Sequence, residues 1–326
     1  MDKHKLTFTQ VVEGYILAQE ARQLSVHTLD DYKNTFNKIL KFWEFDPVFN
    51  EIAAEDIEQF LATIGSTPQE VGGVAPRYIE KLSEKTLLNY HTGLSALWTW
   101  AVGNALAERH VLEKIKPPKP KKSEIVPLSK DDIEAMLAVV DRSQPYKRPG
   151  KRECSHKLPT ATRNRTIILL LLDTGIRVSE LCDLRIRDVD QRNRRVKVLG
   201  KGNKERSLPY CPATGQAIWR YLSSRPDSSV DDFLFVTENG QRLDRRYVRT
   251  TLKRIGDRAN VRGVHPHRFR HTFAVNYLRN GGNAYGLQSS LGHESLEMVK
   301  KYLQIVQADL DNAHRQASPV ANWQLR

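Results

Sequence analysis

A proline- and lysine-rich stretch near the middle of the chain constrains the fold most. The segment KIKPPKPKKSEIVPLS, residues 114–129, carries Pro117, Pro118 and Pro120 within four positions. Proline lacks an amide donor and its ring clashes with the preceding helical turn, so no helix can run through this segment. The 326 residues also exceed the roughly 250–300 that a single core usually serves. We therefore predict two domains, residues 1–113 and 129–326, with residues 114–128 as an extended linker.

The residues before the linker have the spacing of amphipathic helices. LTFTQVVEGYILAQEARQLS aligns Val11, Tyr15 and Ile16 along one side, and the segments near 26–45, 54–64 and 83–102 repeat this pattern. A loop punctuated by glycine and proline, near residues 65–77, interrupts the helices. No strand is predicted in this half, which should form a small helical bundle.

The residues after the linker combine helices with one predicted hairpin. SKDDIEAMLAVV opens with a capping box from Ser129 to Asp132, and a long basic loop follows over residues 144–160. TIILLLLDTGIRVSELCDLRIRDVD indicates a buried helix, a glycine turn and a second helix. RRVKVLGKGNKERSLPY alternates as a β-hairpin, and the remainder is helical. The predicted fold class is mainly α with a small β-sheet.

The charge of the chain predicts a polyanionic partner. Lys and Arg number 51 against 38 acidic residues, a net charge of +13, which favours nucleic acid over a membrane surface. The longest apolar run, residues 167–172, is far shorter than the ~20 residues of a membrane helix. The N-terminus has no apolar signal core, and the three cysteines share no metal-like spacing. We expect a cytoplasmic protein, in which the linker lysines are either solvated or bound to DNA phosphates.

Two cations occupy turns that the hydrophobic pattern does not explain. Arg177 falls between the two helices of DTGIRVSEL, where pairing with Glu180 is the simplest role. Lys201 is at the tip of the LGKGNKER hairpin, where a lysine is either merely solvated or presented to a groove of DNA.

A third cluster, HPHRFRHTF, places His265, His267 and His271 with Arg268 and Arg270 at the start of a helix. His267 and His271 have the one-turn spacing of zinc ligands, but two adjacent arginines make a cation unfavourable. Arginine and histidine at a helix N-terminus suit an oxyanion, above all a phosphate.

The last candidates are His293 and Tyr302 in LGHESLEMVKKYL. On one unbroken helix the nine residues between them would turn the chain by ~900°, so their side chains would face opposite ways. Ser295 is a good N-cap, so we predict a helix that begins there, with His293 in the preceding turn. The break allows both side chains to converge, with Tyr302 at the edge of the buried face.

These four motifs together resemble the catalytic domain of the tyrosine recombinases, the family of phage integrases and Xer-type resolvases. TGIRVSEL resembles the family's first arginine motif, and LGKGNKERSLP resembles its lysine hairpin. HPHRFRHTFA resembles the His-x-x-Arg-His motif, and LGHESLEMVKKY the final histidine–tyrosine motif. Their order and spacing fit along roughly residues 125–315. Phe269 stands where leucine is usual, and the loops near 65–77 and 144–160 are longer than in compact members, which leaves specificity and regulation open.

The resemblance implies DNA cleavage through a 3′-phosphotyrosyl intermediate, with Tyr302 as nucleophile. Arg177 and Arg270 would clamp the phosphate, and Lys201 would protonate the 5′-oxygen. His267 would act as base or hydrogen-bond partner, and His293 would bond a non-bridging oxygen. His271 and Glu180 would support the site.

The resemblance also implies the partners. The substrate would be double-stranded DNA with an inverted-repeat site, clamped by a core-binding domain formed by the first helices. A tetramer would assemble through the C-terminal tail, without metal, ATP or another cofactor, and the protein would associate with the nucleoid when acting. Integration, transposon excision and dimer resolution all stay open. The alternatives are a type IB topoisomerase, a non-catalytic DNA-binding regulator and a zinc-dependent nuclease.

Overall fold

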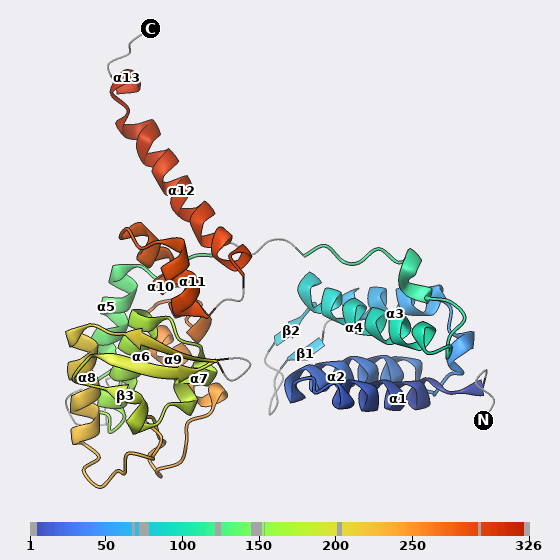
Figure 1. Cartoon of the computed structure of the whole chain (residues 1–326), viewed down its shortest axis with the longest axis horizontal. Coiled ribbons are helices and arrows are strands. Elements are labelled where there is room, and N and C mark those ends of the chain that lie inside the picture. Colours follow the sequence, from blue (N-terminus) through green and yellow to red (C-terminus); the bar gives the residue numbers. More distant parts are fainter. Residues whose placement is uncertain are drawn as a thin grey trace. The chain divides into compact units, whose positions relative to one another are not determined.

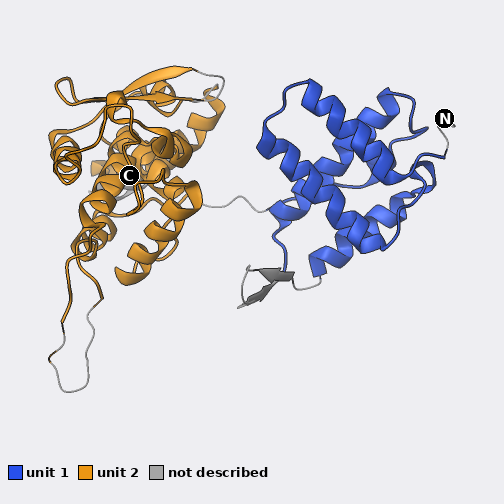
Figure 2. Ribbon diagram, turned by 90° about the horizontal axis from the view of Figure 1, so that it is seen from below, with its two compact units in different colours: residues 1–123 blue, residues 124–326 orange. Residues whose placement is uncertain are grey.

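The computed structural model describes residues 5–66, 69–71, 78–120, 125–144, 152, 154–200, 204–292 and 295–322. The chain divides into two compact units, residues 1–123 and 124–326 (Figure 2). The boundary falls inside the segment predicted as a linker. Ile115 is buried in the core of the first unit, whereas Leu128 is buried in that of the second, so the two ends of the segment pack with different units.

In the described part of the first unit the α-helices are α1 (Phe8–Ala21), α2 (Val26–Trp43), α3 (Ala54–Ser66) and α4 (Glu84–Gly103). A 3-10 helix, η2 (Phe49–Glu51), lies between α2 and α3, and a second, η3 (Val111–Lys114), follows α4 and contacts α3 and α4. The core is rich in aromatic side chains, and the rings of Phe49 and Trp98 stack with centroids 4.7 Å apart. Such contacts add to the burial of apolar area, so this small unit has a core of its own.

The absence of strands predicted for the first unit is wrong. Strands β1 (Gln69–Val71) and β2 (Tyr78–Glu80) pair antiparallel in the loop between α3 and α4. Each strand has three residues, too few to reveal the alternation by which a strand is recognised.

The second unit is mainly helical with a small sheet, as predicted (Figure 1). Its helices are α5 (Lys130–Val139), α6 (Ala161–Thr174), α7 (Val178–Asp183), η4 (Ile186–Asp188), α8 (Pro212–Ser223), α9 (Arg245–Arg258), α10 (Pro266–Arg279), α11 (Ala284–Leu291), α12 (Glu297–Ala317) and α13 (Pro319–Asn322). The capping box of Ser129 with Asp132 forms at the start of α5. Of the basic loop 144–160, residues 145–151 and 153 lie outside the described part of the chain.

The predicted hairpin forms the larger part of a three-stranded sheet in the order β3-β4-β5. β4 (Arg195–Leu199) pairs antiparallel with β5 (Glu205–Pro209), and the short β3 (Val189–Asp190) adds a strand that was not predicted. Val196 and Leu208 are buried partners across the hairpin.

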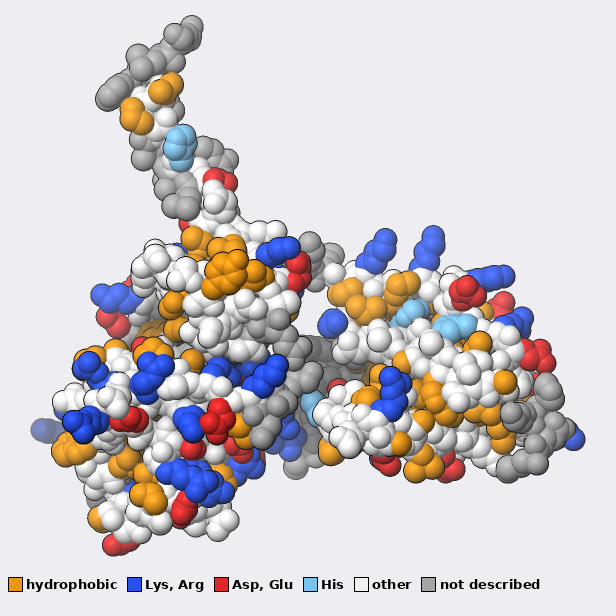
Figure 3. All heavy atoms as spheres, viewed as in Figure 1, with side chains coloured by type: hydrophobic (Ala, Val, Ile, Leu, Met, Phe, Trp, Pro, Cys, Tyr) orange, Lys and Arg blue, Asp and Glu red, His pale blue; other side chains and the backbone are white. Residues whose placement is uncertain are grey.

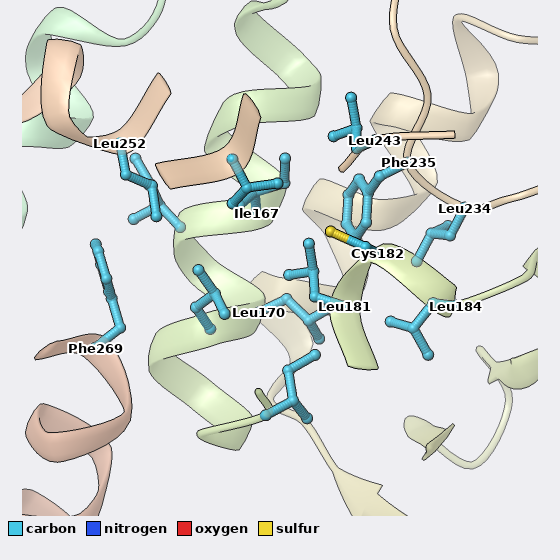
Figure 4. Packing of buried hydrophobic residues seen from close by; sticks show 14 of the residues in the cluster. Ile167, Leu170, Leu181, Cys182, Leu184, Leu234, Phe235, Leu243, Leu252 and Phe269 are labelled. Carbon is cyan, nitrogen blue, oxygen red and sulfur yellow. The ribbon is translucent and has the colours of Figure 1, made fainter. Parts of the chain in front are cut away.

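Helix α6 is the centre of the core of the second unit. Figure 4 shows Ile167 and Leu170 of α6 between side chains of α7, α9 and α10, with Leu181 on one side and Phe269 on the other. α6 contacts both α8 and α10. A helix packed on several sides has a fixed last turn, and the arginine motif begins at that turn.

The helix break predicted between His293 and Tyr302 is present. Gly292 caps α11 in the left-handed conformation, with φ of +62°. The prediction that Ser295 caps the next helix is wrong, because α12 begins at Glu297 with Leu296 as N-cap and no side-chain cap bond. Leu296 packs against the cluster that contains Val299, so apolar burial sets this start. None of the described helices has the length and apolar run that a bilayer crossing requires.

Candidate active site

Arg177 lies in the turn between α6 and α7 and is held in place by Glu180. The turn is possible because Gly175 adopts a φ of +61° and ends α6. The Arg177 amide donates to Glu180 Oε2 at 2.8 Å, and its Nη1 donates to Oε1 at 2.9 Å. Its Nη2 donates to the Gly292 carbonyl at 3.1 Å. The motif predicted from sequence is thus tied to the turn that precedes His293.

Arg270 approaches the same place from α10. Its side chain is buried, and Nη1 and Nη2 donate to the carbonyls of Gly175 (2.8 Å) and Leu291 (2.7 Å). Burial and the neighbouring Arg177 lower the pKa of Arg270 to about 10, so the guanidinium is still charged at neutral pH. Two cations in one site provide stabilisation for a phosphate.

Two histidines of α10 connect this region to Tyr302. The rings of His267 and His271 have centroids 4.2 Å apart, and His271 Nδ1 lies 2.8 Å from the Tyr302 hydroxyl oxygen. Burial, with His267 next in effect, lowers the pKa of His271 to about 4, and burial with nearby Arg270 also lowers that of His267. Neutral His271 can accept a proton from the hydroxyl when Nδ1 is its unprotonated nitrogen.

Tyr302 is more deeply buried than predicted. It was expected at the edge of the buried face of α12, but only 3% of it is exposed. The reason is that α12 packs against α10 and α11, where Tyr302 joins a cluster with Val275, Leu287 and Val299. Burial raises the pKa of the Tyr302 hydroxyl, although Arg270 opposes this.

A cavity of about 600 Å³ opens beside the arginines and His267. Its lining is strongly basic and consists of Ile176, Arg177, Val178, Ser179, Arg245, Arg249, His265, Pro266, His267 and Arg270. Tyr302 is not in this lining: His267 lines the cavity and contacts His271, which in turn contacts Tyr302. Arg245 and Arg249 were not predicted as site residues, although their spacing of four places them on one face of α9.

Lys201 and His293, two of the predicted catalytic residues, lie outside the described residues. The other predicted residues, Arg177, His267, Arg270, Tyr302 and the supporting Glu180 and His271, are all brought together. Sequence reasoning missed Arg206, which pairs with Glu180 at 2.7 Å. Alternation along β5 would have placed it on the inner face with Leu208. Within the described ranges no three His, Cys, Asp or Glu side chains group as metal ligands do.

Comparison with known proteins identifies the family to which this chain belongs. The model of the phage integrase family matches residues 128–308. Tyrosine recombinase XerC of Corynebacterium efficiens is 32% identical over 247 residues, 74% of each chain. Tyrosine recombinase XerC of Staphylococcus aureus is 31% identical over 306 residues, 92% of this chain and 93% of the relative. The Tn1549 transposon integrase, in complex with transposon right end DNA, has a similar fold, with a TM-score of 0.72 at 18% identity over 94% of this chain and 99% of that chain.

This chain therefore belongs to the phage integrase family of tyrosine recombinases. It is a tyrosine-type site-specific DNA recombinase, which cleaves and rejoins strands through a phosphotyrosyl intermediate.

Proposed function

We propose that Tyr302 is the nucleophile and that His271 takes its proton. The observation that carries this proposal is the 2.8 Å contact between His271 Nδ1 and the Tyr302 hydroxyl. A phenol has a pKa of about 10, and burial raises the pKa of Tyr302 further, so the hydroxyl needs a base as it attacks. His271, predicted only as a support, places a neutral ring nitrogen at that hydroxyl. His267 was predicted as the base or as a hydrogen-bond partner.

In the proposed reaction the Tyr302 oxygen forms a bond to phosphorus while the bond to the 5′-oxygen breaks. The phenolic proton passes to His271, and Lys201 supplies a proton to the departing 5′-oxygen. Arg177 and Arg270 hold the non-bridging oxygens, whose charge grows in the transition state. The reverse reaction with another strand completes the exchange, because the phosphotyrosyl ester retains the energy of the original bond.

His267 and His293 complete the proposed site. His267 lines the cavity and packs on His271, so it would fix the orientation of that ring and donate to the phosphate. His293 would bond a non-bridging oxygen, and Glu180 would orient Arg177. Since Tyr302 is buried outside the cavity lining, we expect α12 to shift when DNA binds, so that the hydroxyl reaches the phosphate while it keeps its contact with His271.

The proposed substrate is double-stranded DNA with an inverted-repeat site. Residues 1–113 would bind DNA as a core-binding domain, residues 114–128 would link it to the catalytic residues 129–326, and the C-terminal tail would join subunits into a tetramer. The net charge of +13 and the basic cavity support a DNA partner. We place this activity in the cytoplasm, at the nucleoid.

Covalent trapping on nicked duplexes in EDTA tests the proposal. Wild-type protein should form a protease-sensitive DNA adduct on a denaturing gel, and Tyr302→Phe should form none while it still binds DNA. Tyr285→Phe is the matched control, because Tyr285 is 73% exposed on α11. His271→Gln should slow adduct formation by about 100-fold, because a general base contributes roughly 100- to 10,000-fold to a rate.

Three results would reject the proposal. An adduct that survives in Tyr302→Phe means that the nucleophile is another residue. Clear binding to a cognate site without any adduct favours a regulator, and strand breakage that EDTA abolishes favours a metal-dependent nuclease. A supercoiled plasmid carrying two sites separates recombination from the relaxation that a topoisomerase would give.

A further inference from the structure

Strand β5 carries an arginine into the inner side of the sheet, where an apolar residue is usual. Arg206 alternates with Ser207, so it shares a face with the buried Leu208. The side chain of Arg206 is 13% exposed, and that of Glu180 is 4% exposed. Burying a guanidinium in this way costs free energy unless all its donors are paired. The partners of Arg206 therefore indicate which parts of the site it positions.

Every nitrogen of the Arg206 guanidinium has a partner. Nη1 donates to Glu180 Oε1 at 2.9 Å and Nη2 to Oε2 at 2.7 Å, in the forked geometry that arginine and carboxylate share. Nε donates to the Ser290 carbonyl at 2.9 Å, two residues before Gly292. One side chain therefore joins the hairpin, the arginine motif and the end of α11.

Two glycines pack against the same guanidinium. A Cβ atom at Gly292 would lie 3.1 Å from Arg206 Nη1 and 3.3 Å from Cζ, and one at Gly200 would lie 3.2 Å from Nη1. Contacts this short leave little room for a side chain at either position. Gly200 and Gly292 directly precede Lys201 and His293 in the sequence. The guanidinium of Arg206 thus lies close to both of the glycines that precede these two predicted catalytic residues.

Arg206 also changes the net charge around Arg177 and Glu180, which form an ion pair beside the cavity. Glu180 accepts from Arg177 as well as from Arg206, and these two arginines outweigh the effect of burial and keep its pKa low. Alone, the ionised carboxylate would cancel the charge of Arg177. With Arg206 present, the three groups sum to +1, so Arg177 keeps its attraction for an anion in the cavity.

We propose that Arg206 is a positioning residue for DNA cleavage, which acts through Glu180 and through the backbone at Gly200 and Gly292. It fixes the orientation of Arg177 and the net charge around it without touching the DNA, and it restricts the positions of Gly200 and Gly292. This inference rests on the proposed function, since it concerns the rate of the same cleavage step.

The test compares single-turnover adduct formation at saturating nicked DNA in the full-length protein. Arg206→Lys keeps the positive charge but loses the two parallel hydrogen bonds to Glu180, and Arg206→Met loses both the charge and these bonds. We expect both to slow cleavage by about 10- to 100-fold, since small errors in placement cost this much, with Kd for DNA unchanged within about threefold. Arg195→Lys is the control, because Arg195 of β4 is exposed and the contacts described for its side chain are hydrogen bonds to Ser207. It should cleave as the wild type does.

A double-mutant cycle adds a readout that loss of stability would not move. If Arg206 acts through Glu180, Arg206→Met should slow Glu180→Gln protein much less than it slows wild-type protein. Three outcomes would overturn the proposal. Arg206→Lys could cleave at the wild-type rate, or Arg206→Met could slow Glu180→Gln protein by the same factor as it slows wild-type protein. The cleavage rate of the variants could also be restored by cooling below their melting range. A rise in Kd that accounts for the whole loss would overturn it as well. Failure of the wild type to form an adduct would instead reject the proposed function.

Discussion

The contact between His271 and Tyr302 depends on the protonation state of one buried ring. His271 is surrounded by positive or potentially positive groups, namely His267, His265, Arg270 and Lys301, and these together with burial keep it neutral. A neutral ring is what a tyrosine hydroxyl needs as a partner. The same surroundings make the folded state sensitive to acid.

We predict that the second unit loses stability between pH 6.5 and 4. The pKa of His271 falls from 6.5 to about 4 on folding, so both states are neutral above pH 6.5 and its contribution is then complete. As the pH falls below 6.5 the unfolded chain binds a proton that the folded chain does not, which lowers the unfolding free energy by on the order of 2 kcal/mol after allowance for partial exposure. Amide exchange of α10 peptides, corrected for intrinsic rates, measures this loss.

His271→Gln is the matched variant for this prediction, because glutamine does not titrate. Its unfolding free energy should change less between pH 6.5 and 4 than that of the wild type, with a remaining slope from His267, whose pKa is also lowered. Equal slopes in the two proteins would mean that His271 is not the group responsible.

Among the elements, the turn from α6 to α7 governs the geometry of both arginines. Gly175 has a φ of +61°, and a Cβ atom there would lie 2.4 Å from Phe273 Cδ1. Its carbonyl also accepts from Arg270 at 2.8 Å. We predict that Gly175→Ala lowers the unfolding free energy by about 2–5 kcal/mol, from backbone strain and overpacking together, and that adduct formation is largely lost.

Gly240→Ala separates strain from crowding. Gly240 has a φ of +74°, but a Cβ atom there would meet nothing within 4 Å. Gly240→Ala should lower the unfolding free energy only by the strain of the left-handed backbone, about 1–2 kcal/mol. Urea unfolding of both variants measures the difference. Equal losses would show that Phe273 rotates away at little cost.

The elements near the site were predictable where local pattern decides them. The glycine turn before Arg177, the hairpin and the capped start of α5 follow from residues adjacent in sequence. The start of α12 at Glu297 and the burial of Tyr302 do not, because both depend on packing against α10 and α11. His271 lies 31 residues from Tyr302, and no periodicity links two helices at that distance. Strand alternation predicts that Arg206 shares the inner face of β5 with Leu208. It does not predict that a charged side chain there is paired with Glu180.

At the scale of the whole molecule, each of the two units has its own core. The second unit also has a long helix, α12, that projects from it. α12 continues well past the body of the second unit (Figure 1). On the face in Figure 3, hydrophobic side chains gather near the base of this helix, whereas Lys and Arg are interspersed with acids over the rest of the unit. Tyr285 and Met298, from α11 and α12, are 73% and 47% exposed. Exposed apolar surface of this kind favours contact with another protein surface, and we expect it to receive the C-terminal tail of a neighbouring subunit.

We predict that a chain ending at Val306 still folds and binds DNA but no longer forms a tetramer on it. Ile305 and Val306 pack against the cluster that holds Tyr302, so the truncation keeps the contacts that bury this tyrosine. It removes the rest of α12, with the Arg279–Asp309 ion pair, and α13. Mass photometry on duplexes with a full inverted repeat should show mainly complexes of one or two subunits, whereas the wild type should form tetramers. A chain ending at Asn322, which keeps α12 and α13, is the control and should assemble fully. Tetramers of the shorter chain at wild-type concentrations would locate the subunit contact elsewhere, and loss of DNA binding by a single subunit would mean that the tail supports its own unit.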